Sequence, residues 1–130
     1  MKEEISKLLK IGFLVHFLVS AIFGLMFLVV VESYVSLTGW PYLDPVTGRV
    51  LGALFIGLAV ASLLAWRETK WAHVKIIVQM EIVWLVIGTV VQMWAAFLYP
   101  VLIIMWFQAA IFVFFLVAFS WFYYDQELAD

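Results

Sequence analysis

Cysteine is absent from this chain of 130 residues, and charged side chains make up only 12% of it. Without cysteine, the chain has no disulfide, no thiol nucleophile and no cysteine-based metal site. The net charge is -2 and the Lys and Arg residues form no basic stripe, so no nucleic-acid binding is expected. The sequence also lacks an HExxH motif and a glycine-rich phosphate loop, so no metal site is predicted and any cofactor is unknown.

Apolar residues make up 68% of the chain, well above the roughly 50% of a soluble domain. They form four runs, each close to the roughly 20 residues that a helix needs to cross a bilayer. Backbone groups in lipid must be satisfied internally, so these runs are expected to be helices. The sequence therefore predicts an all-α, antiparallel bundle of four transmembrane helices, one domain over residues 1–130. The predicted helices cover about 8–31, 45–66, 70–98 and 100–124.

Cationic residues lie almost entirely on one side of the predicted membrane. Arg49 alone lies on the other side. The remaining six precede the first helix or separate the second from the third: Lys2, Lys7, Lys10, Arg67, Lys70 and Lys75. Because cations favour the cytoplasmic side, we expect a multi-pass protein of the cell membrane with both termini in the cytoplasm.

The connections between the predicted helices are uneven in length. Residues 32–49 form the only sizeable loop, and Asp44-Pro45 within it is predicted as N-cap and first residue of the second helix. Trp40 in this loop is interpreted as an interfacial anchor, with capping of a lipid or quinone pocket as the alternative. Pro100 is expected to open the fourth helix, and the first ten residues to extend the first helix as a charged segment.

Small residues predict which helix faces pack inside the bundle, because helices in lipid associate through close contacts. The second helix repeats a small residue every four positions. The predicted seam comprises Ala53, Gly57, Ala61 and Ala65. The first helix has a similar series that includes Gly12, Ser20 and Gly24, and the third helix contributes Gly88.

Polar residues within the helices fall at two depths. At about 1.5 Å per residue, His16, Ser62 and Glu81 each lie about 8–9 Å inside the cytoplasmic boundary, one on each of the first three helices. Gln92 and Gln108 lie about 11 Å from the outer boundary by the same rise. We therefore predict an inner cluster of His16, Ser62 and Glu81, and an outer layer of the two glutamines.

Glu81 is the main candidate for a functional residue, because an ionisable group inside a membrane span costs about 2.5–3.5 kcal/mol to insert. It is interpreted as a proton-titrating or cation-binding group or the polar anchor of a ligand pocket. The alternatives are a structural carboxyl, protonated or bonded to His16, and a position near the interface with Lys75 if the third helix enters the membrane later. Haem ligation by the two histidines is disfavoured, because His73 lies at the interface while His16 is deeper. No catalytic residue is assigned.

Residues 44–67, DPVTGRVLGALFIGLAVASLLAWR, resemble the second-helix region of DoxX-like four-helix membrane proteins, in which Arg-x-x-Gly (here Arg49 to Gly52) opens a helix of small residues. The resemblance implies a four-helix membrane fold. Such families have links to quinone-associated electron transfer and to complexes with other membrane proteins, and no functional residue is transferred from them.

Three functions remain as hypotheses. The first is a non-enzymatic protein that binds an apolar ligand, a lipid or quinone, or serves as a homo-oligomer or subunit of a membrane complex. The second is a small proton-coupled transporter or channel with Glu81 as coupling site. The third is a membrane enzyme acting on a lipid-like substrate. The first is favoured, because no second deep carboxylate, metal motif or cofactor motif accompanies Glu81.

Overall fold

The computed structural model describes residues 2–129, and within that range the chain is helical apart from short connections. Four helices in these residues are long and apolar enough to cross a membrane. They are α1 (Lys7–Val29), α3 (Pro45–Arg67), α4 (Trp71–Leu98) and α5 (Ile103–Tyr123), the last continued by the short π-helix η1 (Tyr124–Leu128). The predicted all-α fold with four transmembrane helices is confirmed, and the chain is a multi-pass membrane protein.

A fifth, shorter helix, α2 (Val31–Thr38), lies in the segment that the sequence predicted to be loop. The chain bends at Val30, which separates α1 from α2, and α2 ends at Gly39 in the left-handed conformation that glycine favours (φ 69°). Val31 and Tyr34 are three residues apart and form its buried face. Eight residues with a mixed polar pattern give too weak a hydropathy signal for the helix to be expected from sequence.

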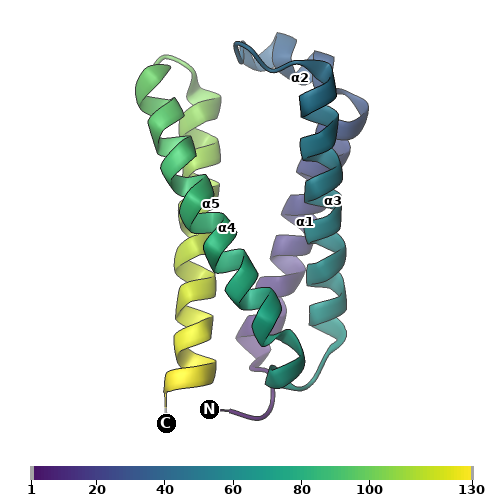
Figure 1. Cartoon of the computed structure of the whole chain (residues 1–130), viewed down its shortest axis with the longest axis vertical. Helices are drawn as coiled ribbons and strands as arrows, with labels where there is room; N and C mark the ends of the chain where they lie inside the picture. Colours follow the sequence, from purple (N-terminus) through teal and green to yellow (C-terminus); the bar gives the residue numbers. More distant parts are fainter. Residues whose placement is uncertain (1, 130) are drawn as a thin grey trace.

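The long helices form two pairs, α1 with α3 and α4 with α5, which make the most extensive contacts in the molecule. The axes of the two pairs lie close together at the end that carries both termini and diverge toward the end that carries α2 (Figure 1). The larger hydrophobic core includes Leu9, Phe13, Trp71 and Phe119, on helices of both pairs. A smaller core of Phe27, Val31 and Tyr34 lies at the α2 end.

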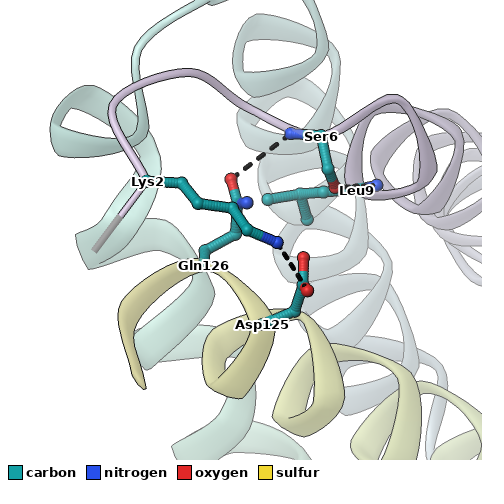
Figure 2. A network of polar contacts seen from close by, with 5 residues as sticks. All are labelled: Lys2, Ser6, Leu9, Asp125 and Gln126. Carbon is teal, nitrogen blue, oxygen red and sulfur yellow. Dashed lines mark hydrogen bonds and ion pairs between the residues drawn. The ribbon is translucent and has the colours of Figure 1, made fainter. Parts of the chain in front are cut away.

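A polar junction ties the N-terminal segment to η1 (Figure 2). The Lys2 ammonium pairs with the Asp125 carboxylate at 2.6 Å, and the Ser6 N–H donates to the Gln126 side-chain oxygen at 3.3 Å. On the other side of this segment, the Trp71 N–H donates to the carbonyl of Glu3 at 2.9 Å. The first residues therefore link α5 to the start of α4.

Two helix starts differ from those expected. Residues before Lys7 do not extend α1, because Ser6 caps that helix by accepting from the Leu9 N–H at 3.2 Å. Pro100 does not open α5, because that helix begins at Ile103 after a turn. The carbonyl oxygen of Pro100 accepts a hydrogen bond from the Trp106 indole N–H at 3.1 Å. The start of α3 is as predicted: Asp44 is the N-cap, and its carboxylate accepts from the Thr47 N–H at 2.9 Å.

The packing face of α3 also differs from the predicted seam. Ala53 and Gly57 are exposed, and a Cβ on Gly57 would have no atom of the described residues within 4 Å. The buried small residues are Gly48, Gly52, Ala59, Ser62 and Ala65, with Ala61 partly buried. Successive steps of four drift about 40° each around a helix, whereas mixed steps of three and four stay on one face. The prediction that Gly57 contacts a neighbouring helix of this chain is therefore wrong.

The glycines chosen on the other helices do lie against neighbours. A Cβ on Gly12 would come within 2.6 Å of the Phe122 ring, and one on Gly24 within 2.8 Å of the Ile56 side chain. Gly88 lies against the ring of Phe112. These glycines therefore mark close contacts between helices, as the sequence indicated.

Candidate functional site

Three helices bring His16, Ser62 and Glu81 together in the interior. The Nδ1 atom of His16 on α1 lies 2.7 Å from the Ser62 hydroxyl oxygen on α3. Its Nε2 atom lies 3.6 Å from a carboxyl oxygen of Glu81 on α4. The side chains are 4%, 0% and 0% exposed for His16, Ser62 and Glu81, so the protein encloses the cluster. The predicted inner cluster is therefore present.

Glu81 is unusual within this cluster, because neither of its carboxyl oxygens has a hydrogen-bond partner among residues 2–129. Ionised carboxylates are rarely buried unless they are paired and hydrogen-bonded. His16 is the basic group that faces Glu81, and the two can share one proton between imidazole and carboxyl. The arrangement can hold a proton, but it contains no nucleophile with an oxyanion-binding device.

Aromatic rings hold the imidazole of His16 in place. The ring of Phe115 meets it edge-on at a centroid distance of 4.8 Å, and that of Phe119 at 5.4 Å. Ser20, one turn along α1, lies 3.4 Å from Nε2. The Phe-rich sequence of α5 thus divides between two roles, because Phe115 and Phe119 are buried while Phe114 is exposed.

A cleft of about 50 Å³ is lined by residues of all four long helices, from His16 and Ser20 on α1 to Gln92 on α4 and Gln108 on α5. Aromatic side chains dominate its wall: Phe23, Phe27, Trp40, Phe55, Trp84, Phe112 and Phe115. Several of them, including Phe55, Trp84 and Phe112, are partly exposed, so the space is open at its side. Cavities with apolar walls and a few polar groups are typical ligand sites.

The far end of the cleft carries the two glutamines predicted as the outer layer. Gln92 on α4 and Gln108 on α5 both line it. The Gln108 amide nitrogen donates to the Tyr34 hydroxyl, which links α5 to α2. The side-chain oxygens of both glutamines are buried and have no hydrogen-bond partner in the part of the chain that the structure describes.

Sequence reasoning missed Tyr34 and underrated Trp40. Trp40 lines the cleft, which favours the alternative interpretation of that loop as a cap over a ligand pocket. Tyr42, two residues later, is 90% exposed. The Tyr34 ring packs on Phe27 at 4.8 Å and on Trp40 at 6.0 Å, so α2 and its loop cover this end of the cleft. Burial raises the pKa of the Tyr34 hydroxyl, which therefore stays neutral.

Charged groups at the α2 end lie outside the cleft. Arg49 contacts both carboxylate oxygens of Glu32, at 2.9 Å and 3.1 Å. A hydrogen bond from its own backbone N–H and then the bond from Arg49 lower the pKa of Glu32. Hydrogen bonds from Thr47 likewise lower the pKa of Asp44.

No group of three or more metal-ligating side chains occurs within residues 2–129. His73 lies at the surface and contacts Glu68 at 2.9 Å, far from the cluster around His16. The two histidines therefore do not face a common site.

The fold and the cleft define a small multi-pass membrane protein with an aromatic interior cleft and one buried acid–base pair. No family model, curated protein or solved structure matches this chain. The resemblance of residues 44–67 to DoxX-like proteins therefore stays a prediction.

Proposed function

We propose that this protein binds an apolar molecule from the bilayer, a lipid or a quinone, in the cleft between its two helix pairs. The observation that carries the proposal is the aromatic wall of the cleft, with His16 and Ser20 at one end and Gln92 and Gln108 at the other. A long apolar wall with a few polar groups suits an amphiphilic ligand. The partly exposed side chains along the cleft support lateral entry from the membrane.

The size of the cleft sets a condition on binding. A cavity that holds a benzene ring measures about 150 Å³, whereas this cleft measures about 50 Å³. A ring-sized head group therefore requires the helix pairs to separate. The weaker contact between the pairs, relative to the contact within each pair, supports such a movement, and the polar junction of the termini would hold the opposite end together.

The proposed setting is the cell membrane, with both termini and the polar junction on the cytoplasmic side. The six-to-one distribution of cations supports this orientation. We further propose that the protein acts as a homo-oligomer or as a subunit of a larger membrane complex.

Tryptophan fluorescence provides the test, because Trp84 lines the cleft and quinones quench indole emission. The purified protein in lipid nanodiscs would be titrated with a decyl-substituted 1,4-benzoquinone. We expect saturable quenching that is reduced in Trp84→Phe and largely lost when Trp84→Phe is combined with Trp40→Phe, because both indoles line the cleft. Trp94→Phe is the matched control, since Trp94 lies on the same helix, is 63% exposed and does not line the cleft. Quenching that never saturates, or that Trp84→Phe and Trp94→Phe reduce equally, would contradict the proposal.

A second candidate function, a proton-coupled carrier, is favoured by one observation. Glu81 is fully buried beside His16 and has no hydrogen-bond partner among the described residues, as in groups that exchange protons inside membranes. Protein-containing liposomes with an internal pH-sensitive dye would test it. Proton entry that is faster than in empty liposomes and is lost in Glu81→Gln would favour this candidate. Equal rates of proton entry in wild type, Glu81→Gln and empty liposomes would show that the protein does not conduct protons without a second substrate.

A further inference from the structure

The outer end of the cleft contains two hydrogen-bond acceptors that the protein leaves unused. Gln108 is 5% exposed, and its side-chain oxygen has no partner among residues 2–129. Gln92 is partly buried, and its side-chain oxygen is likewise buried and without a partner among these residues. Both residues line the cleft, from two neighbouring helices. Buried polar atoms are nearly always hydrogen-bonded, so a pair of free carbonyl oxygens in one cleft indicates a donor that belongs to a ligand.

Tyr34 determines which atoms of Gln108 are free. The amide nitrogen of Gln108 donates to the Tyr34 hydroxyl, and this contact leaves the amide oxygen without a partner. Tyr34 is itself held between Phe27 and Trp40 in the cap over the cleft. The acceptor is therefore held by packing that involves α2.

The cleft also lacks the groups that a charged head would need. None of its lining residues in the described chain is Lys, Arg, Asp or Glu. Arg49 also lies at the α2 end of the molecule, but its guanidinium is paired with the Glu32 carboxylate at 2.9 Å. A phosphate or carboxylate placed beside Gln92 and Gln108 would have no counter-charge in the cleft, and burial of an unpaired charge is strongly unfavourable.

We infer that the ligand of this cleft is an uncharged lipid with a hydroxyl group, bound with the hydroxyl at Gln92 and Gln108 and its apolar body along the aromatic wall. The inference rests on the proposed function and names the ligand class. A hydroxyl supplies one donor, which the Gln92 oxygen can accept with Gln108 beside it, whereas an ester, ether or quinone carbonyl supplies only acceptors.

Matched probes separate these classes. Equilibrium binding to the protein in phosphatidylcholine nanodiscs would be measured for 4-nonylphenol, its methyl ether and its phosphate ester. We expect the phenol to bind roughly tenfold more tightly than the ether, the ratio for one buried hydrogen bond. The phosphate ester should bind more weakly than the phenol.

Glutamine variants test whether the preference arises at this end of the cleft. Gln92→Met keeps the length of the side chain and removes its acceptor, so the ratio of phenol to ether affinity should fall below that of the wild type, with the Gln108 oxygen as the acceptor that remains. Gln79→Met is the matched control on the same helix, because Gln79 is exposed and contacts Tyr123 instead. Gln92→Met is preferred to a change at Gln108, since loss of the Tyr34 contact could disturb folding.

The outcomes distinguish this inference from the proposed function. Equal or tighter binding of the ether, tighter binding of the phosphate ester, or an unchanged ratio in Gln92→Met would overturn the hydroxyl assignment while ligand binding stands. Binding of none of the probes would overturn both.

Discussion

The imidazole of His16 and the hydroxyl of Ser62 meet at 2.7 Å in the interior, although 46 residues separate them in the chain. The contact joins α1 to α3 at a level where nearly all other side chains are apolar. It also fixes one ring nitrogen, so that the other is directed toward Glu81 and Ser20. The orientation of the acid–base pair therefore depends on Ser62.

Replacement of this serine should destabilise the protein. Ser62→Ala leaves a buried ring nitrogen without its partner, which typically costs about 1–3 kcal/mol. Thermal unfolding in detergent would measure the loss. Ser120→Ala on the exposed face of α5 is the control and should change the stability little. Equal stability of both variants would show that the contact contributes nothing.

Two glycines of α3 make a second matched pair. A Cβ on Gly52 would lie 2.7 Å from the backbone nitrogen of Leu28 and 2.9 Å from the carbonyl oxygen of Gly24. Backbone atoms cannot move aside cheaply, so Gly52→Ala should cost about 1–3 kcal/mol through overpacking. Gly57→Ala should instead raise the stability by about 0.5–1 kcal/mol, because alanine is the better helix former and the space around it is open. Thermal unfolding of the two variants measures this difference, and the reverse order would contradict the packing described for α3.

The sequence was sufficient to predict the four long helices and which of their polar residues lie at the same level, because both follow from local hydropathy and a fixed rise per residue. His16, Ser62 and Glu81 could be expected at one level for this reason. Rotation about the helix axis was harder to predict. In lipid, both faces of a helix are apolar, so the small residues Ala53 and Gly57 do not by themselves reveal the packed face.

The outer end of the cleft shows a second limit of sequence reasoning. Gln92 and Gln108 were recognisable as polar groups within apolar helices, but their partner Tyr34 lies on α2, a helix too short to give a hydropathy signal. The position of Tyr34 depends on the bend at Val30 and on packing against Phe27. Such tertiary contacts have no local pattern in the chain.

The ion pair between Glu32 and Arg49 predicts a specific response to pH. Because the pKa of Glu32 is lowered in the folded protein, its stabilising contribution is complete at neutral pH and is lost as the pH falls through the folded pKa. Arg49→Gln should therefore raise the pKa of Glu32 part of the way toward its ordinary value, since the backbone hydrogen bond remains. Carbon-13 NMR of the Glu32 carboxyl would follow the titration. An unchanged pKa in Arg49→Gln would show that the contact does not form in solution.

Cysteine labelling would establish the orientation in the membrane, and the absence of native cysteine removes any background. Single cysteines at Ser33 or Thr47, which are exposed near the α2 end, should react with impermeant reagents added to intact cells. One at Thr69, exposed at the opposite end, should react only after permeabilisation. Labelling of Thr69→Cys from outside would reverse the orientation inferred from the cations.

Two replacements of Glu81 separate its contribution to folding from a role in function. Neither carboxyl oxygen of Glu81 is hydrogen-bonded within residues 2–129, and His16 keeps its contact with Ser62 when Glu81 is replaced. A buried polar group without a hydrogen bond is unfavourable, so its replacement by an apolar side chain of similar volume removes that cost. We therefore expect Glu81→Leu to leave the thermal stability unchanged or raise it by about 1 kcal/mol.

Glu81→Gln should fold equally well, because it keeps the shape of the side chain without its titrating proton. If Glu81 and His16 share a proton during binding or transport, both variants should retain the fold and lose the dependence of quinone binding or proton entry on pH. Measurement of the quenching titration over a series of pH values provides the readout. His16→Gln, which disrupts the pair from the other side, should lose the same pH dependence. Unfolding of Glu81→Leu with normal behaviour of Glu81→Gln would instead make Glu81 a structural residue, held by hydrogen bonds in the membrane.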